Sequence, residues 1–382
     1  MAEERTQSRL AFVDAARGLA VVLMLQTHAY DAWLRPELRG TEFFRWSQLI
    51  GGLPGALFLF LMGVSSALGN DKARALGVSS GALVRRGLGR AALLLAVAFA
   101  FRLTMYLASD RPDFGAVFRV DVLNCLSLAL ALVSLVDLTP GPNGRILSSL
   151  GIAAWFAIAT PLAWDGGAVD GLPERLAGYL SGRVANTSFP LFPWAAFAFA
   201  GHATGSWIGK VNPGGLGRLM NSLPGLGIVL IPLSMALDRL PTLGSRYDYW
   251  ATSPNFVLAK TGVLILILAA CFHFERLSRR TAGIARSGLE LVFVALIQMG
   301  RTSLFIYCVH VDLVYGSRAL PKLWRSCEIG QASRNLAVLT LAMLALSYGW
   351  SFAKRAFAEM RAKGFSMPKG TSTQTRHSPP PH

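Results

Sequence analysis

The chain has 382 residues, of which 53% are hydrophobic and only 15% are charged, and its mean hydropathy is +0.44. This composition predicts a polytopic membrane protein and excludes a soluble globular one. The net charge of +16 does not indicate a nucleic-acid partner, because the basic residues lie in loops between apolar spans, where they set the topology. The four cysteines have no paired spacing, so we expect neither a disulfide framework nor a metal site.

We expect an all-α fold with about ten transmembrane helices. Residues 1–353 form a single transmembrane domain, and residues 354–382 form a basic tail, rich in Pro and Ser, that we expect to be disordered. The predicted spans are 11–33, 50–69, 88–108, 120–138, 146–164, 189–208, 221–239, 256–275, 297–316 and 335–353.

The first span, AFVDAARGLAVVLMLQTHAYDAW, is apolar but carries Asp14, Arg17, His28 and Asp31. At helical spacing these four residues fall within an arc of about 100°, so one polar face runs along the helix. Ionisable groups inside a span are costly and usually face a cavity or a partner. Asp14 and Arg17 can simply neutralise each other at i,i+3 spacing. His28 is deeper, titrates near neutral pH, and has Asp31 one turn away to orient its ring, which favours a chemical role.

Later spans carry further polar groups at the end that we expect to lie at the same depth as His28. The fourth span opens with FRVDVLNCLSL and places Arg119, Asp121 and Asn124 there. The sixth opens with NTSFPLFPW, where two prolines interrupt the helix beside Trp194. The ninth, GRTSLFIYCVHVDLVYG, carries Tyr307 and His310, with Arg301 toward the other membrane face. The Gly-rich loop 165–188 is either a lid or a linker.

The distribution of charge predicts the orientation of the chain. About 20 of the 37 Lys and Arg residues lie in loops on the side of the N-terminus, against about 13 on the other side. With an even number of spans, both termini are then cytoplasmic. The N-terminal residues MAEERTQSRL are too polar and acidic for a signal peptide, so we expect the first span to be retained.

Known catalytic motifs are missing from the sequence: it has no Walker A loop, GxGxxG, HExxH or GxSxG. What remains is an acid/base site centred on histidine. A transporter or channel that uses the same polar face without acyl chemistry is the competing interpretation. Binding of acetyl-CoA would distinguish the two.

Four motifs together resemble a known family. DAARGLAVVLMLQTH, FRVDVLNCLSL, SFPLFPW and GRTSLFIYCVH, in this order, are similar to bacterial members of the heparan-alpha-glucosaminide N-acetyltransferase family. Arg17 and His28, separated by ten residues, also look like the signature of the wider membrane acyltransferase superfamily. The sequence departs from the animal enzyme, whose catalytic histidine follows the first span, because loop 34–49 contains no histidine.

The resemblance implies transfer of an acetyl group from cytoplasmic acetyl-CoA to an extracytoplasmic sugar or glycolipid, in the inner membrane of a bacterium. His28 would be the general base or a nucleophile, with Asp31 orienting it and His310 as the alternative base. Arg17 and Arg301 would hold the CoA arm. The acceptor side would be lined by Arg119, Asp121, Asn124, Trp194 and Tyr307. The expected partners are membrane lipids and a glycan or glycolipid, and homodimerisation is an open alternative.

Overall fold

The computed structural model describes residues 2–364 except 110–112, 166, 168, 185–186, 213, 241–246, 281–282 and 316–319. Within these residues the fold is all-α, and two isolated bridges, Leu34–Cys327 and Val120–Thr187, are the only extended pairing. The helices are α1 (Ala2–Trp33), α2 (Glu42–Gly51), α3 (Leu53–Ala75), α4 (Ser80–Ala108), α5 (Val122–Leu135), α6 (Gly141–Asp165), α7 (Glu174–Leu180), α8 (Leu191–Lys210), α9 (Leu216–Leu237), α10 (Pro254–Arg280), α11 (Gly283–Arg301), α12 (Ser303–Tyr315) and α13 (Ile329–Gly364). Short 3-10 turns lie at Pro36–Gly40, Phe114–Phe118, Val136–Leu138 and Pro321–Leu323.

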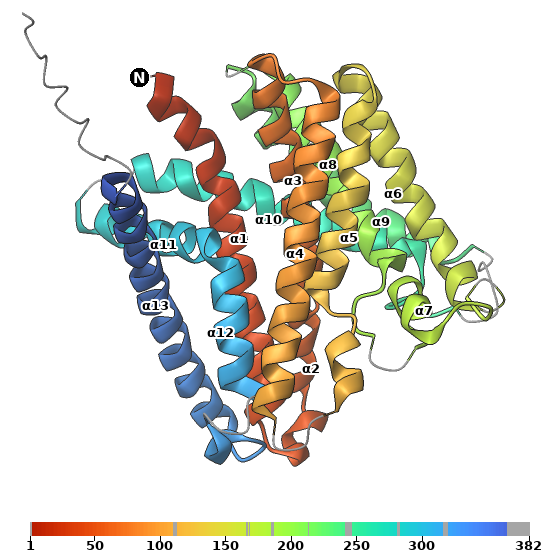
Figure 1. Ribbon diagram of the computed structural model, residues 1–382, viewed down its shortest axis with the longest axis vertical. Coiled ribbons are helices and arrows are strands. Elements are labelled where there is room, and N and C mark those ends of the chain that lie inside the picture. The colour runs from red at the N-terminus through yellow and green to blue at the C-terminus, as the bar shows by residue number, and fades with distance from the viewer. Residues whose placement is uncertain are drawn as a thin grey trace, which may run out of the picture.

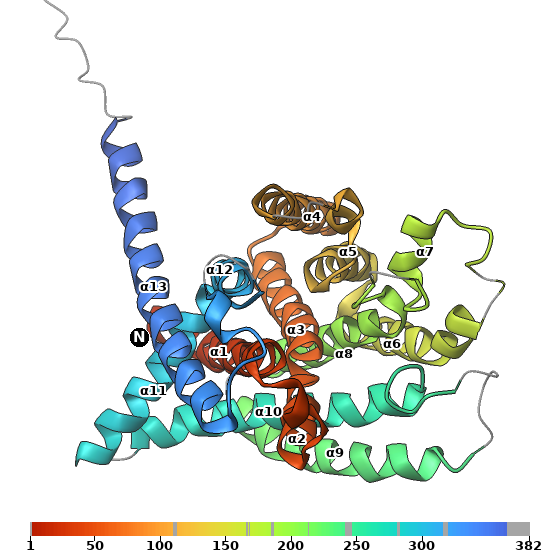
Figure 2. The same ribbon diagram turned by 90° about the horizontal axis from the view of Figure 1, so that it is seen from below.

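Figure 1 shows α1, α3, α4, α5 and α12 running side by side along the long axis. In Figure 2 these five helices are seen nearly end-on, whereas α9 and α10 are seen lengthwise and cross them. The first residues of α1 and the last residues of α13 lie at the same end of the molecule (Figure 1). We call this the N-terminal end.

Six helical segments among the described residues are long and apolar enough to cross a membrane, and counting one bent pair gives seven. The protein is therefore a polytopic membrane protein, but the predicted count of ten spans is not confirmed. Helices α1 and α8 are not among the six. Both carry polar or small residues on buried faces, which lowers their hydropathy although they lie inside the bundle.

The ninth predicted span, 297–316, is wrong as a single helix. Its residues divide between α11 and α12, which meet at an angle of 83° around Thr302. Helix α11 crosses α1, and α12 then runs beside it (Figure 1). The bend thus converts one apolar stretch into two helices with different neighbours.

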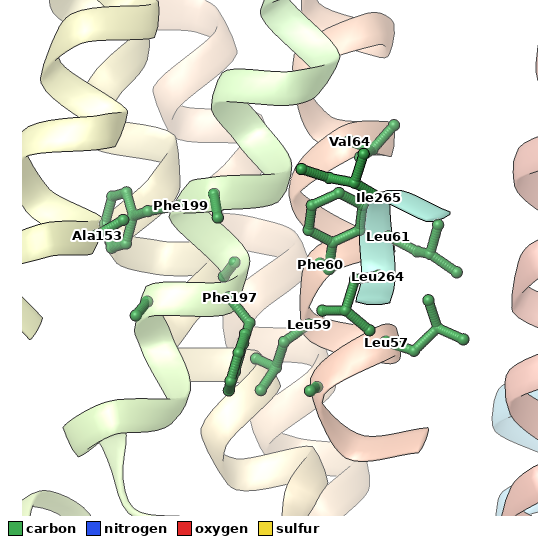
Figure 3. Close-up of a cluster of buried hydrophobic side chains, with 14 of the residues drawn as sticks. Leu57, Leu59, Phe60, Leu61, Val64, Ala153, Phe197, Phe199, Leu264 and Ile265 are labelled. Atoms are coloured by element: carbon green, nitrogen blue, oxygen red, sulfur yellow. The ribbon is translucent and has the colours of Figure 1, made fainter. Parts of the chain in front are cut away.

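The hydrophobic core is centred on α3 and α8, whose backbones approach closely through glycine. A Cβ at Gly201 would lie 1.9 Å from the carbonyl oxygen of Phe60, and one at Gly63 would lie 2.0 Å from that of Ala198. Small residues permit this kind of close helix contact in membranes. Figure 3 shows Phe60 and Val64 of α3 with Phe197 and Phe199 of α8 in the same cluster, next to side chains of α10.

A second glycine contact fixes α11 against α1. A Cβ at Gly300 would lie 2.0 Å from the carbonyl oxygen of Asp14, and one at Gly18 would lie 1.9 Å from that of Leu296. The two backbones therefore touch at the N-terminal end. Because α12 starts at Ser303, directly after this contact, the contact also sets the position of α12 beside α1.

We predict that Gly300→Val strongly destabilises the protein, because the added atoms would overlap the α1 backbone, and overpacking costs typically ~1–3 kcal/mol or more. Gly288→Val is the matched control: it lies in the same helix, and a Cβ there meets nothing within 4 Å. Thermal unfolding of both variants in detergent measures the difference. Equal melting temperatures for the two variants would contradict the α1–α11 contact.

Candidate active site

His28 of α1 and His310 of α12 form a hydrogen-bonded pair. Nδ1 of His28 lies 2.8 Å from Nε2 of His310, and the two rings are nearly parallel, with an interplanar angle of 7°. His310 is completely buried, whereas His28 is half-buried. Two residues that are 282 positions apart in the chain are thereby joined inside the bundle.

The hydrogen bonds assign the tautomers of both rings. Nδ1 of His310 lies 2.7 Å from the carbonyl oxygen of Ile306, which can only accept, so this nitrogen carries the proton. Nε2 of a neutral His310 must then accept, and Nδ1–H of His28 donates to it. This leaves the lone pair on Nε2 of His28, for which the described residues supply no donor. His28 therefore has the form of a base whose ring is held in place by a second histidine.

His28 lines a cavity of about 520 Å³, which we call the histidine cavity. Its lining contains more charge and hydroxyl groups than the apolar grooves elsewhere on the molecule. The charged, histidine and phenol groups come from α1, α4, α12 and the segment before α5, and they are His28, Asp31, Arg102, Arg119, Asp121, Tyr307 and Tyr315. The structure thus brings together at one cavity five of the residues that the sequence predicted at this depth.

Asp31 lines the same cavity but does not make the predicted bond to His28. Its carboxylate accepts hydrogen bonds from Nη2 of Arg39 at 2.9 Å and from the hydroxyl of Tyr315 at 3.0 Å. Arg39 also donates to the backbone oxygen of Asp31. The ring of His28 is oriented by His310 instead. The i,i+3 spacing put Asp31 on the correct face of the helix, but the competing donors determined where the carboxylate points.

Asp121 is held in place by its local sequence. It is the N-cap of α5, where its side chain accepts from the backbone N–H groups of Leu123 and Asn124, and Asn124 completes a capping box. The second carboxylate oxygen pairs with Arg102 of α4 at 2.8 Å and accepts from the hydroxyl of Tyr307 at 3.4 Å. An acid, a cation and a phenol from three helices thus form one network on the cavity wall.

Three further predicted residues occupy different positions around the cavity. Arg119 lines it and donates to Ser188 at 3.3 Å, and no carboxylate among the described residues pairs with it. Asn124 does not reach the cavity; its amide donates to the hydroxyl of Tyr179 at 3.1 Å, and burial raises the pKa of that tyrosine. Trp194 packs behind Phe189, which does line the cavity, with the ring centroids 4.5 Å apart.

A second cavity of about 290 Å³ lies closer to the N-terminal end, and we call it the arginine cavity. Arg17 and Arg90 line it, together with Ser65, Ser66 and Ser303. Arg17 donates to the carboxylate of Asp14 at 2.9 Å and to the hydroxyl of Ser65 at 2.7 Å. The ion pair with Asp14 that was considered as an alternative is therefore present, and Arg17 nevertheless contributes to the cavity wall.

Arg301 was predicted to join Arg17, but it does not line either cavity. Its Nε donates to the other carboxylate oxygen of Asp14 at 3.1 Å, and its side chain is 57% exposed. Asp14 thus bridges two arginines at the crossing of α1 and α11. Arg301 is the last residue of α11, directly before the bend, so its side chain lies at the crossing of α1 and α11 and not beside Arg17 in the cavity.

The two cavities share one wall. Phe58 of α3, Val122 of α5 and Tyr307 of α12 line both of them. Arg17 and His28 lie on the same helix, eleven residues or about 16 Å apart, on opposite sides of this wall. A single layer of side chains therefore separates the arginine cavity from the histidine cavity.

From the sequence, Arg102 and Tyr315 carry no predicted role, and Arg90 belongs to a basic edge that either sets the topology or contacts an anionic ligand. Arg102 lies inside the third predicted span, and a charge within a span is itself a signal for a functional or paired group. Arg90 lies in the first turn of the same predicted span, where it resembled a basic residue at a membrane edge. Tyr315 had no distinguishing signal, since a tyrosine at the end of a span commonly lies at the interface.

Comparison with known proteins adds an independent observation. The family model for the catalytic region of heparan-alpha-glucosaminide N-acetyltransferase matches residues 9–223. The matched region includes His28, Arg17, Arg119 and Asp121, but it ends before α12 and His310. No curated protein matches the sequence. Because the family model covers more than half of the 382 residues, the chain belongs to the heparan-alpha-glucosaminide N-acetyltransferase family of transmembrane acetyltransferases.

Proposed function

We propose that the protein transfers an acetyl group from cytoplasmic acetyl-CoA to a hydroxyl or amine of an extracytoplasmic sugar or glycolipid. The observation that carries this proposal is the wall shared by the arginine cavity and the histidine cavity. Donor and acceptor can enter such a site from opposite membrane faces and meet at Tyr307. A transporter would need a continuous path, whereas group transfer needs only that the reacting atoms meet.

The general base in this proposal is His28. Its Nε2 lone pair takes the proton from the acceptor hydroxyl or amine as that group attacks the thioester carbonyl carbon. The imidazolium that forms keeps its Nδ1–H bond to the neutral Nε2 of His310, which stabilises the positive charge. When the carbon–sulfur bond breaks, the same proton passes to the departing thiolate of CoA. His310 acts as a positioning residue for His28.

Charge that develops on the carbonyl oxygen requires donors close to the shared wall. Arg102 is the candidate, because it lines the histidine cavity, is held by Asp121 and has further N–H groups to donate, whereas the single O–H of Tyr307 is donated to Asp121. Preorganised donors of this kind supply much of the rate enhancement in acyl transfer. Arg119, which has no carboxylate partner within the described ranges, is available for the acceptor itself.

On the donor side, Arg17 and Arg90 provide two guanidinium groups for the phosphates of CoA, a natural partner for arginine. The distance of about 16 Å along α1 from Arg17 to His28 is one that an extended pantetheine arm can cover. Because acetyl-CoA is a cytoplasmic metabolite, this arrangement requires the N-terminal end of the bundle to face the cytoplasm. We accordingly place the protein in the bacterial inner membrane with both termini inside.

The direct test of the function is incubation of the purified protein with labelled acetyl-CoA and an extract of cell-envelope glycans. Label should move from CoA to a glycan or glycolipid. Absence of both acetyl-CoA binding and transfer would favour the transporter interpretation.

For the catalytic pair, we predict that His28→Ala lowers turnover by roughly 10²- to 10⁴-fold, the usual contribution of a general base, without weakening acetyl-CoA binding. His310→Ala should cause a smaller loss, because His310 is fully buried and acts only through its hydrogen bond to His28. Turnover and CoA affinity are measured separately for both variants. If His310→Ala is inactive while His28→Ala is near normal, the base has been assigned to the wrong histidine.

For the donor site, Arg17→Gln and Arg90→Gln should each weaken acetyl-CoA binding about tenfold, since each removes a charge-assisted contact from the cavity. Arg301→Gln is the matched control, because it also removes an arginine near Asp14 but lies outside the cavity lining. Equilibrium binding in detergent measures all three. A larger effect of Arg301→Gln than of Arg17→Gln would contradict the assignment.

The orientation can be tested with a single cysteine at Ser378 in a background lacking the four native cysteines. We expect a membrane-impermeant thiol reagent to label this cysteine only after the cells are permeabilised. Labelling in intact cells would place the C-terminus outside and would reverse the donor and acceptor sides.

A further inference from the structure

Lys260 of α10 is a half-buried cation within a candidate membrane span. Its Nζ donates to the carbonyl oxygen of Gly52 at 2.7 Å and lies 4.2 Å from the ring centroid of Phe256. In the described part of the chain no carboxylate lies within ion-pair distance of it. A lysine ammonium carries three N–H donors, and the bond to Gly52 uses one. The ring of Trp194 also faces the ammonium, with its centroid 5.2 Å from Nζ, but neither ring is a hydrogen-bond acceptor of the strength of an anion, so two N–H groups remain for a further partner.

Lys260 lines a groove of about 610 Å³ between α2, α9 and α10. The other walls of the groove are largely apolar and come from Leu49, Ile50, Leu53, Ile231, Met235 and Trp250. Met235 and Trp250 are each 63% exposed, an exposure that suits contact with acyl chains rather than water. The groove is distinct from the histidine cavity, although both border the junction between α2 and α3.

Asp238, the C-cap of α9, lines the same groove. Its carboxylate accepts from the neutral amide of Asn255 at 3.2 Å, and none of the described cations pairs with it. The groove therefore carries one positive and one negative group that do not neutralise each other. A ligand that satisfies both must itself carry both charges next to an apolar portion.

We propose that this groove binds a phosphatidylethanolamine molecule. The phosphate accepts from the free N–H groups of Lys260, the ammonium donates to Asp238, and an acyl chain lies along the apolar walls. A phosphatidylglycerol headgroup has no cation for Asp238, and the trimethylammonium of phosphatidylcholine has no N–H to donate. The site accordingly selects ethanolamine over both alternatives. This inference does not depend on acetyl transfer.

The test is lipid titration of the purified protein by native mass spectrometry, using phosphatidylethanolamine, phosphatidylcholine and phosphatidylglycerol with identical acyl chains. The protein should bind phosphatidylethanolamine at least about tenfold more tightly than the other two. Lys260→Met should lower that affinity about tenfold, whereas Lys322→Met, at an exposed lysine outside the groove, should leave it unchanged. Equal affinity of the wild-type protein for all three lipids overturns the proposal.

Two further variants test the negative charge and the groove independently of whether Lys260→Met folds. Asp238→Asn should weaken phosphatidylethanolamine binding and strengthen phosphatidylglycerol binding, because the repulsion of an anionic headgroup is removed. Ile231→Trp fills the groove and leaves the contacts of Lys260 with Gly52 and Phe256 in place, so it should exclude the lipid. Undiminished lipid binding by Ile231→Trp, or an unchanged preference in Asp238→Asn, would place the lipid elsewhere.

Discussion

The polar face of α1 is the constraint on which the arrangement of this protein depends. Ionisable groups inside a membrane span must be paired or must line a cavity, because an isolated charge there is costly. Each polar group on α1 meets this requirement through another part of the fold: Asp14 through Arg301 of α11, Arg17 through Ser65 of α3, and His28 and Asp31 through His310 and Tyr315 of α12. Helices α3, α11 and α12, which pack against α1, carry the matching groups.

Backbone contact provides the precision that side-chain pairing needs. Gly18 and Gly300 let α1 and α11 touch, and the 83° bend at Thr302 then starts α12 at a fixed place beside α1. A change in either contact would move His310 relative to His28. Their hydrogen bond of 2.8 Å tolerates little displacement, so a packing contact at the N-terminal end bears directly on the geometry of the His28–His310 pair.

The distribution of charge divides the interior into functionally different spaces. The arginine cavity has Arg17 and Arg90 as its charged residues in an otherwise largely apolar lining, whereas the histidine cavity holds acids, cations and phenols in linked networks. The groove beside Lys260 differs again, with single opposite charges and apolar walls. The junction of α2 and α3 borders two of these spaces. The same short segment can thus contribute to a polar chamber on one side and to a lipid-facing groove on the other.

The sequence by itself determined the membrane class, the helical segments and the polar face of α1, because composition and helical periodicity act within one segment. It also located Asp121, whose cap is formed by its own neighbours. Only the tertiary structure decided that His310 rather than Asp31 holds His28, that Arg301 and Trp194 lie outside the cavities, and that Arg90 and Arg102 line them. These outcomes depend on the bend at Thr302 and on contacts between distant helices. Periodicity gives the direction of a side chain around its own helix but contains no information about which helix lies opposite.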